Sequence, residues 1–183
     1  MDNLNLVLPE IFMSVSIMFL LILGVFKKDS SQLIFNLSLF TILIVVIVTI
    51  NETFSVNRIL LFNEGVVIDY MASFMKIITL IGGFLVLIIS SNYLKSFKIF
   101  KIEYPILVLS SVLGMMIMIS SNDLLVFYMG LELQSLALYV LATFNRDQLK
   151  SSEAGLKYFV LSALSSGLLL YGCSLIYGFS GST

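Results

Sequence analysis

Long apolar stretches separated by short polar segments make up most of the chain. Stretches of this kind can cross the roughly 30 Å hydrocarbon core of a bilayer as α-helices. Six of them meet that length, at residues 8–26, 33–50, 66–91, 104–120, 123–143 and 154–178. The connections are too short to hold a soluble domain. We therefore expect an all-α fold in which residues 1–183 form a single transmembrane domain, a polytopic bundle of six transmembrane helices.

Residues at the ends of these stretches support the helix boundaries. Pro9 suits the first turn of a helix, and Glu10 beside it lies at the positive end of the helix dipole. The polar segment 120–123 is a tight turn that supplies N-capping side chains such as Asp123. The fourth and fifth helices are therefore expected to form an antiparallel hairpin.

The amino-acid composition excludes several classes of protein and of functional site. Apolar residues make up 59% of the chain and charged residues 11%, whereas soluble domains carry about 25% charged residues. The net charge of −1 offers no basic surface for nucleic acid. There is no histidine, and Cys173, expected to be buried in a helix, is the single cysteine. We therefore expect no catalytic residue, metal site or cofactor site in this chain, and no nucleic-acid partner.

Basic residues gather in alternate connections. One set of connections holds seven of them, Lys27, Lys28, Lys95, Lys98, Lys101, Arg146 and Lys150. The other set holds Arg58, with Glu52 and Glu64 around it. The positive-inside rule then predicts an N-terminus outside the cell and cytoplasmic loops at 27–32, 92–103 and 144–153.

One carboxylate lies near the middle of a predicted helix. Glu132 is nine residues into the fifth apolar stretch, where an ionisable group costs about 2.5–3.5 kcal/mol to insert. Spacings of three and four residues place polar side chains on the same helix face, namely Tyr128, Ser135, Tyr139, Thr143 and Arg146. The face is either a polar path for ions or a set of interhelical hydrogen bonds that only holds the bundle together.

Two lysines also fall within the predicted helices. Lys157 follows Glu153 by one turn, a favourable pair, and either has a functional role or extends to the interface. Lys76 lies ten residues into the third stretch and is expected to pair with an acid on another helix, which the sequence leaves open. Asp69, near the outer boundary, is expected to be a solvated carboxylate in the first turn.

Several sequence blocks resemble the subunit N family of the bacterial proton-pumping NADH:quinone oxidoreductase, respiratory complex I. The central blocks contain Gly114-Met115-Met116 and Tyr128-x-Gly130-Leu131-Glu132-Leu133-Gln134-Ser135. The resemblance continues through Glu153-Ala154-Gly155-Leu156-Lys157-Tyr158-Phe159 and the opening Leu8-Pro9-Glu10-Ile11. It implies the antiporter-like membrane-arm fold, which is shared with subunits of multi-subunit cation/proton antiporters.

The resemblance also implies a function. In that family a glutamate of the fifth helix and a lysine of the sixth take part in proton translocation, and these match Glu132 and Lys157. The chain would be a subunit of a translocase (EC 7.1.1 class) that couples proton movement to electron transfer from NADH to quinone. Supporting polar residues would be Tyr128, Ser135, Tyr139 and Lys76. NADH, flavin, iron–sulfur clusters and quinone would belong to the rest of the complex.

The setting follows from the same resemblance. The partners would be the other membrane-arm subunits and the lipid bilayer, in a bacterial inner membrane or the equivalent organelle membrane. Members of the family have fourteen helices, and six are expected here. The chain is therefore expected to be an N-terminal fragment, inactive alone, without the broken seventh helix and the second inverted repeat.

Two other hypotheses for the function stay open. The chain could be a subunit of a multi-subunit cation/proton antiporter, which has the same fold. It could also be a small structural scaffold whose membrane charges only hold helices together. Replacing Glu132 and Lys157 with leucine would leave energy coupling unchanged in a scaffold.

Overall fold

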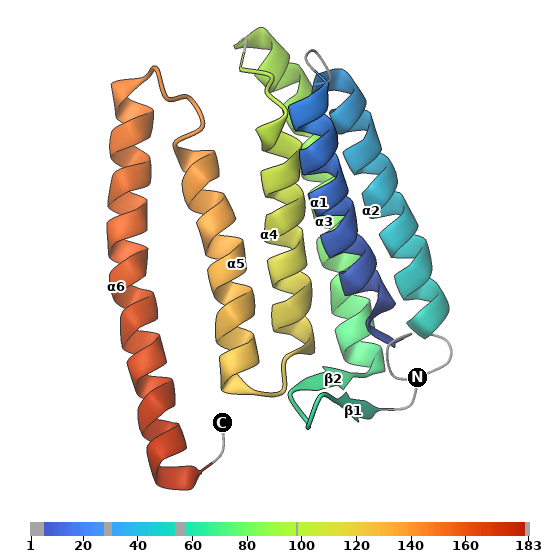
Figure 1. Ribbon diagram of the computed structural model, residues 1–183, viewed down its shortest axis with the longest axis vertical. Helices are drawn as coiled ribbons and strands as arrows, with labels where there is room; N and C mark the ends of the chain where they lie inside the picture. Colours follow the sequence, from blue (N-terminus) through green and yellow to red (C-terminus); the bar gives the residue numbers. More distant parts are fainter. Residues whose placement is uncertain (1–5, 28–30, 54–57, 98, 182–183) are drawn as a thin grey trace.

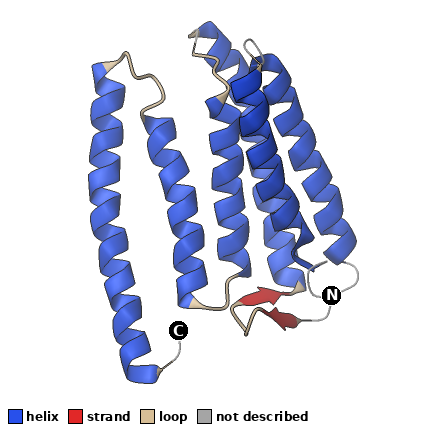
Figure 2. Cartoon of the chain, viewed as in Figure 1, coloured by secondary structure: helices blue, strands red, loops and turns tan. Residues whose placement is uncertain are grey.

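The fold is described from a computed structural model that covers residues 6–27, 31–53, 58–97 and 99–181. Among these residues there are six long helices and one two-stranded hairpin (Figure 2). The helices are α1 (Leu8–Phe26), α2 (Ser31–Thr53), α3 (Tyr70–Ser96), α4 (Glu103–Ser120), α5 (Leu124–Ala142) and α6 (Leu149–Ser180). All six are long and apolar enough to cross a membrane. The predicted multi-pass helix bundle is confirmed.

Helix α4 lies at the centre of the arrangement. It contacts α1, α2 and α3 on one side and α5 on the other, and α6 packs on α5 (Figure 1). In the most apolar stretch of α4, 56% of the residues are buried, against 11% in α6. The molecule thus consists of a four-helix cluster, α1–α4, with the α5–α6 pair attached through α4.

The hydrophobic core lies inside the α1–α4 cluster. On α1 it contains Met13, Ile17 and Leu20, which recur every three or four residues and so share one face. The other fully buried members come from three helices: Ile34, Ile42, Val45, Leu80, Leu87, Leu109, Val112 and Met116. The first four helices therefore bury most of the apolar surface that this chain buries by itself.

Two glycines allow α4 and α5 to approach backbone to backbone. A Cβ atom placed on Gly114 would lie 2.6 Å from the backbone nitrogen of Gln134. A Cβ on Gly130 would lie 2.8 Å from the backbone nitrogen of Met118. Since neither backbone can move aside cheaply, only glycine fits at this crossing. The contact holds the part of α5 that carries Glu132 against α4.

A small hairpin replaces the expected start of the third transmembrane helix. That helix was expected to begin at Val66, but β2 (Val66–Ile68) pairs with β1 (Ile59–Leu61) in antiparallel fashion. The helix begins at Tyr70 because Asp69 caps it, accepting the Ala72 N–H at 2.7 Å. Asp69 is therefore an N-cap, which is a more specific role than a solvated first-turn carboxylate.

The hairpin also contacts the turn between α4 and α5. The Asn122 N–H donates to the carbonyl of Gly65 at 3.0 Å, and its side-chain amide donates to the carbonyl of Glu64 at 2.8 Å. Asp123 caps α5 as expected, accepting the Leu125 N–H at 2.6 Å. These contacts connect the two sides of the molecule at this end of the bundle.

Other helix ends differ modestly from the expected boundaries. Helix α2 extends beyond 33–50 at both ends, and α6 begins at Leu149 where residue 154 was expected. The polar segment 149–153 can still be helical because its side chains extend to the interface and because Glu153 pairs with Lys157. The connection between α5 and α6 is correspondingly shorter.

The connections alternate between the two ends of the bundle. Helix α1 begins and α6 ends at the end that carries the hairpin (Figure 1). The basic residues of the α1–α2, α3–α4 and α5–α6 connections therefore belong to the opposite end; the described ones are Lys27, Lys95, Lys101, Arg146 and Lys150. Lys28 and Lys98 lie outside the described residues.

Candidate functional site

Glu132 lies in the middle of α5 with its side chain half-buried. Its Oε1 atom is fully buried and, among the described residues, accepts no hydrogen bond. Most buried polar atoms in folded proteins have a partner, because an unpaired one keeps its full desolvation cost. A buried carboxylate oxygen of this kind can receive a proton or a hydrogen-bond donor.

The hydroxyl groups on the same face of α5 are mostly bonded to their own helix. The Ser135 hydroxyl donates to the Leu131 carbonyl at 2.7 Å, and the Thr143 hydroxyl donates to the Val140 carbonyl at 3.1 Å. Tyr139 differs, because its hydroxyl bonds to Ser162 on α6. These side chains therefore share one face of α5, and the Tyr139 hydroxyl bond crosses to α6.

Lys157 lies on α6 and is bound to Glu153. Its Nζ donates to Glu153 Oε1 at 2.6 Å, and the two side chains are 68% and 54% exposed. The i, i+4 pair expected from the sequence is confirmed. Within the part of the chain that the structure describes, no hydrogen bond or ion pair joins Lys157 to Glu132. The two residues lie on adjacent helices.

Aromatic contacts hold α6 against α5 near these groups. The ring of Tyr139 packs edge-to-face against Tyr158, with 4.9 Å between the centroids, and against Phe159 at 5.6 Å. Tyr139 therefore contacts α6 through both its hydroxyl and its ring. Thr143, from the same polar set, also reaches α6, because its methyl group packs directly on Gly155.

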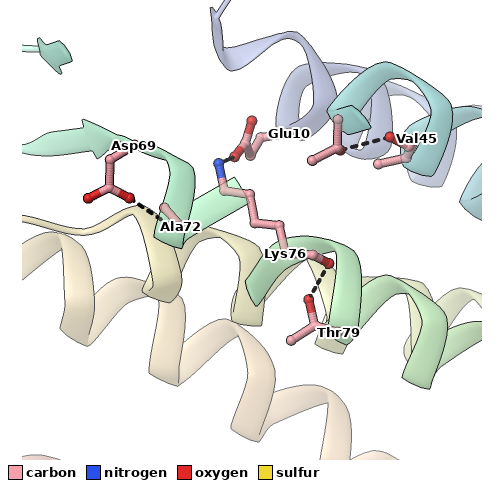
Figure 3. A network of polar contacts seen from close by, with 7 residues as sticks. Glu10, Val45, Asp69, Ala72, Lys76 and Thr79 are labelled. Atoms are coloured by element: carbon pink, nitrogen blue, oxygen red, sulfur yellow. Dashed lines mark hydrogen bonds and ion pairs between the residues drawn. The ribbon is translucent and has the colours of Figure 1, made fainter. Parts of the chain in front are cut away.

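Lys76 pairs with an acid on another helix, as expected, and that acid is Glu10 of α1. Lys76 Nζ lies 2.5 Å from Glu10 Oε1, and the side chains are 4% and 10% exposed. Figure 3 shows the lysine extending from α3 towards α1 to reach this oxygen. Lys76 therefore belongs to the α1–α4 cluster, on the other side of α4 from the Glu132 face.

Glu10 has a role beyond the one predicted from its place in the first turn of α1. A first-turn carboxylate is expected to interact with the helix dipole, whereas the Glu10 side chain is buried and ion-paired. A signal was present in the spacing, because Glu10 precedes Met13 by three residues and Ile17 by seven. These positions share one face, so the apolar inward face of α1 already placed Glu10 towards the bundle.

Among the described residues, no three His, Cys, Asp or Glu side chains lie close enough to hold a metal ion. Cys173 is buried, as expected.

Comparison with known proteins gives matches over the whole chain. NADH-quinone oxidoreductase subunit N of Pelagibacter ubique is 71% identical over 183 residues, which are 100% of this chain and 39% of that protein. The same subunit of Maricaulis maris is 49% identical over 99% of this chain and 38% of its own length. The chain thus spans about two fifths of the length of these curated relatives.

Solved structures give the same fold. Respiratory complex I from Thermus thermophilus with bound aureothin contains a chain that matches with a TM-score of 0.80 and 25% identity, covering 95% of this chain and 37% of that one. The membrane-bound sulfane sulfur reductase, an archaeal respiratory membrane complex, matches with a TM-score of 0.77 and 22% identity over 97% of this chain and 38% of that one. The second match is evidence of the fold alone.

A family model describes part of the chain. The family named NADH:quinone oxidoreductase/Mrp antiporter, transmembrane, matches residues 121–183. This segment contains α5 and α6, with Glu132 and Lys157, while Glu10 and Lys76 lie before it. Sequence, fold and family model agree, and the chain belongs to the antiporter-like family of NADH:quinone oxidoreductase subunit N.

Proposed function

We propose that this chain takes part in proton translocation as part of a membrane-arm subunit of an NADH:quinone oxidoreductase. Electron transfer from NADH to quinone would occur in other subunits, which hold the flavin, iron–sulfur clusters and quinone. The observation that carries the proposal is the buried Oε1 of Glu132, which lacks a donor among the described residues. It lies in the segment that the antiporter family model matches.

The proposed partners are the other membrane-arm subunits and the lipid bilayer. The proposed location is a bacterial inner membrane, or the equivalent organelle membrane, with the N-terminus outside. The described basic residues of the connections support this orientation, because Lys27, Lys95, Lys101, Arg146 and Lys150 belong to one end of the bundle.

Glu132 and Lys157 are the groups proposed to exchange protons. A carboxylate and an ammonium stabilise each other's charged forms when they are close, so a change in their separation alters which of them holds a proton. In this structure Lys157 is bound to Glu153 at 2.6 Å. Its long side chain can leave this exposed pair at small cost. Tyr128, Ser135 and Tyr139 would support water near Glu132.

The test compares Glu132→Gln with Glu132→Asp in a full-length relative assembled into its complex. Glutamine keeps the hydrogen-bonding capacity and removes the charge, whereas aspartate keeps the charge. We expect NADH-driven proton pumping to fall several-fold for glutamine and to be substantially retained for aspartate. Glu64→Gln is the matched control. Glu64 lies in the hairpin turn, and its backbone carbonyl accepts the Asn122 bond, which the substitution keeps. Pumping by Glu132→Gln at the wild-type rate would show that Glu132 is structural.

A cation/proton antiporter subunit is the second candidate, because the matched family includes those antiporters by name. The two functions differ in their energy source. NADH-driven pumping that stops with a quinone-site inhibitor supports the oxidoreductase. Exchange of protons for sodium in membranes without NADH supports the antiporter.

A further inference from the structure

A cavity of about 260 Å³ lies beside the buried ion pair of the α1–α4 cluster. Its walls come from α1, β2 and α4, and include Glu10, Ser14, Val66, Leu113 and Ser120. Because β2 and the end of α4 are part of its walls, the cavity lies near the hairpin end of the bundle (Figure 1). It is separate from the Glu132 face of α5.

Two buried polar atoms in the walls of this cavity lack partners among the described residues. One is Oε2 of Glu10, the carboxylate oxygen that does not contact Lys76, and the other is the hydroxyl oxygen of Ser120. Figure 3 shows the second oxygen of Glu10 turned away from the lysine. Buried unpaired oxygens are costly, and water beside them can satisfy them where there is room for it. The rest of the cavity wall is apolar and is made by Val7, Ile11, Val66, Leu113 and Ile117.

We propose that Glu10, Lys76 and Ser120 form a hydrated proton-binding site at the hairpin end of the bundle. Water in the cavity donates to the free oxygen of Glu10 and contacts the Ser120 hydroxyl. The Glu10 carboxylate accepts a proton that the cavity water relays from the bulk solvent, and it later returns the proton by the same route. In its unprotonated form the carboxylate is paired with Lys76. The site is independent of the function proposed above and lies outside the segment that the antiporter family model matches.

The volume of the cavity and the polar atoms of three of its wall residues fit water as the ligand. A water molecule occupies about 30 Å³ in the liquid, so the volume of about 260 Å³ holds several. A bound water needs two to four polar partners, and the walls provide Glu10 Oε2, Ser120 Oγ and Ser14 Oγ. The Ser14 hydroxyl donates to the Ile11 carbonyl at 2.8 Å and keeps its lone pairs free for water.

Few other ionisable groups surround Glu10. Helix α3 contributes Lys76 and, at its N-cap, Asp69, whose carboxylate accepts the Ala72 N–H. The cavity walls from α4 and β2 contain no Asp, Glu, Lys or Arg. Residues 31–51 of α2 contain none either. Among the described residues, Lys76 is therefore the counter-ion of Glu10.

Access of water can be measured by cysteine labelling of the full chain in lipid nanodiscs. In a Cys173→Ser background, Ser120→Cys should react with a small, water-soluble methanethiosulfonate at least tenfold faster than Met116→Cys. Met116 is the matched control, since it lies one turn earlier on α4, is 0% exposed and does not line the cavity. Equal, slow rates for the two variants would show that the cavity is dry and would overturn the proposal.

Proton binding can be measured by infrared spectroscopy on the same nanodiscs. Acidification of the wild-type chain should produce a carboxyl C=O band that Glu10→Gln lacks and the matched control Glu64→Gln retains. Glu10→Asp should keep a band at a shifted frequency, which tests the site even if Glu10→Gln folds poorly. A band that is unchanged in both Glu10 variants would show that Glu10 does not bind the proton.

Discussion

The α1–α4 cluster and the α5–α6 pair each contain a lysine bound to a glutamate at almost the same distance. Lys76 and Glu10 are 2.5 Å apart and their side chains are 4% and 10% exposed. Lys157 and Glu153 are 2.6 Å apart, with side chains that are 68% and 54% exposed. Distance alone therefore does not tell which pair contributes more to stability. The degree of burial does, because desolvation dominates the energetics of buried charges.

The two pairs also differ in what they connect. Glu10 and Lys76 join α1 to α3 across the core, whereas Glu153 and Lys157 are one turn apart on the same helix. The buried pair therefore specifies how helices assemble. The exposed pair leaves its lysine able to exchange partners, as the proposed proton transfer requires.

The largest expected effect comes from Glu10→Leu. This change leaves the Lys76 ammonium buried without a counter-ion and should lower the free energy of unfolding by about 3–5 kcal/mol. The double variant Glu10→Leu/Lys76→Met should recover most of that loss, because no charge remains buried. The measurement is denaturant unfolding in mixed micelles, followed by circular dichroism. A double variant as unstable as the sum of the two single variants would contradict this account of the pair.

The attachment of α5 to the cluster can be weakened with Gly114→Ala. The added Cβ would lie 2.6 Å from the backbone nitrogen of Gln134 and 2.8 Å from the carbonyl oxygen of Gly130. We expect a loss of about 1–3 kcal/mol from this overpacking, measured in the same unfolding assay. The matched control is Gly82→Ala on α3, where a Cβ has no other atom within 4 Å and should be tolerated. Similar losses for the two variants would mean that the crossing is not limited by the backbone contact.

The hydrogen bond between α5 and α6 should contribute less. Tyr139→Phe keeps the ring packed against Tyr158 and removes the hydroxyl that bonds to Ser162. We expect a loss of about 0.5–1.5 kcal/mol, with no further loss when Ser162→Ala is added. Tyr171→Phe, at a side chain that is 63% exposed, serves as the control. A double-mutant cycle reports the coupling between Tyr139 and Ser162, and zero coupling would exclude a bond between them in the membrane.

The smallest expected effect is that of Lys157→Met. An exposed pair of this kind contributes about 0.2–1 kcal/mol, so unfolding should be nearly unchanged while proton pumping in the assembled complex falls. High salt should remove even this small contribution to stability, because solvent ions screen exposed charges. A loss as large as that of Glu10→Leu would show that Lys157 is buried in the native protein and would remove the contrast between the two pairs.

The helices themselves could be predicted because their causes are local. A continuous apolar stretch must satisfy its backbone hydrogen bonds internally within the membrane, so it becomes a helix. Asp123 was recognisable as an N-cap from its place before the fifth apolar stretch, and Glu153 with Lys157 from their four-residue spacing. The hairpin was not recognised, because Val66–Ile68 is apolar and was assigned to the third helix, although Asp69, the N-cap of α3, separates it from Tyr70.

The sequence by itself determined that this is a membrane protein of six helices, which of its helices carry charges, and the family whose residues they match. It also required Lys76 to have an acidic partner, because an isolated ammonium is costly in the membrane. Only the tertiary structure decided that the partner is Glu10, which lies on another helix at a separation of 66 residues (10 to 76). It also decided that one oxygen of Glu132 is buried without a hydrogen-bond partner among the described residues. The physical reason is that helix formation depends on neighbouring residues, whereas helix packing depends on shape complementarity between distant segments, such as the contact that Gly114 and Gly130 permit.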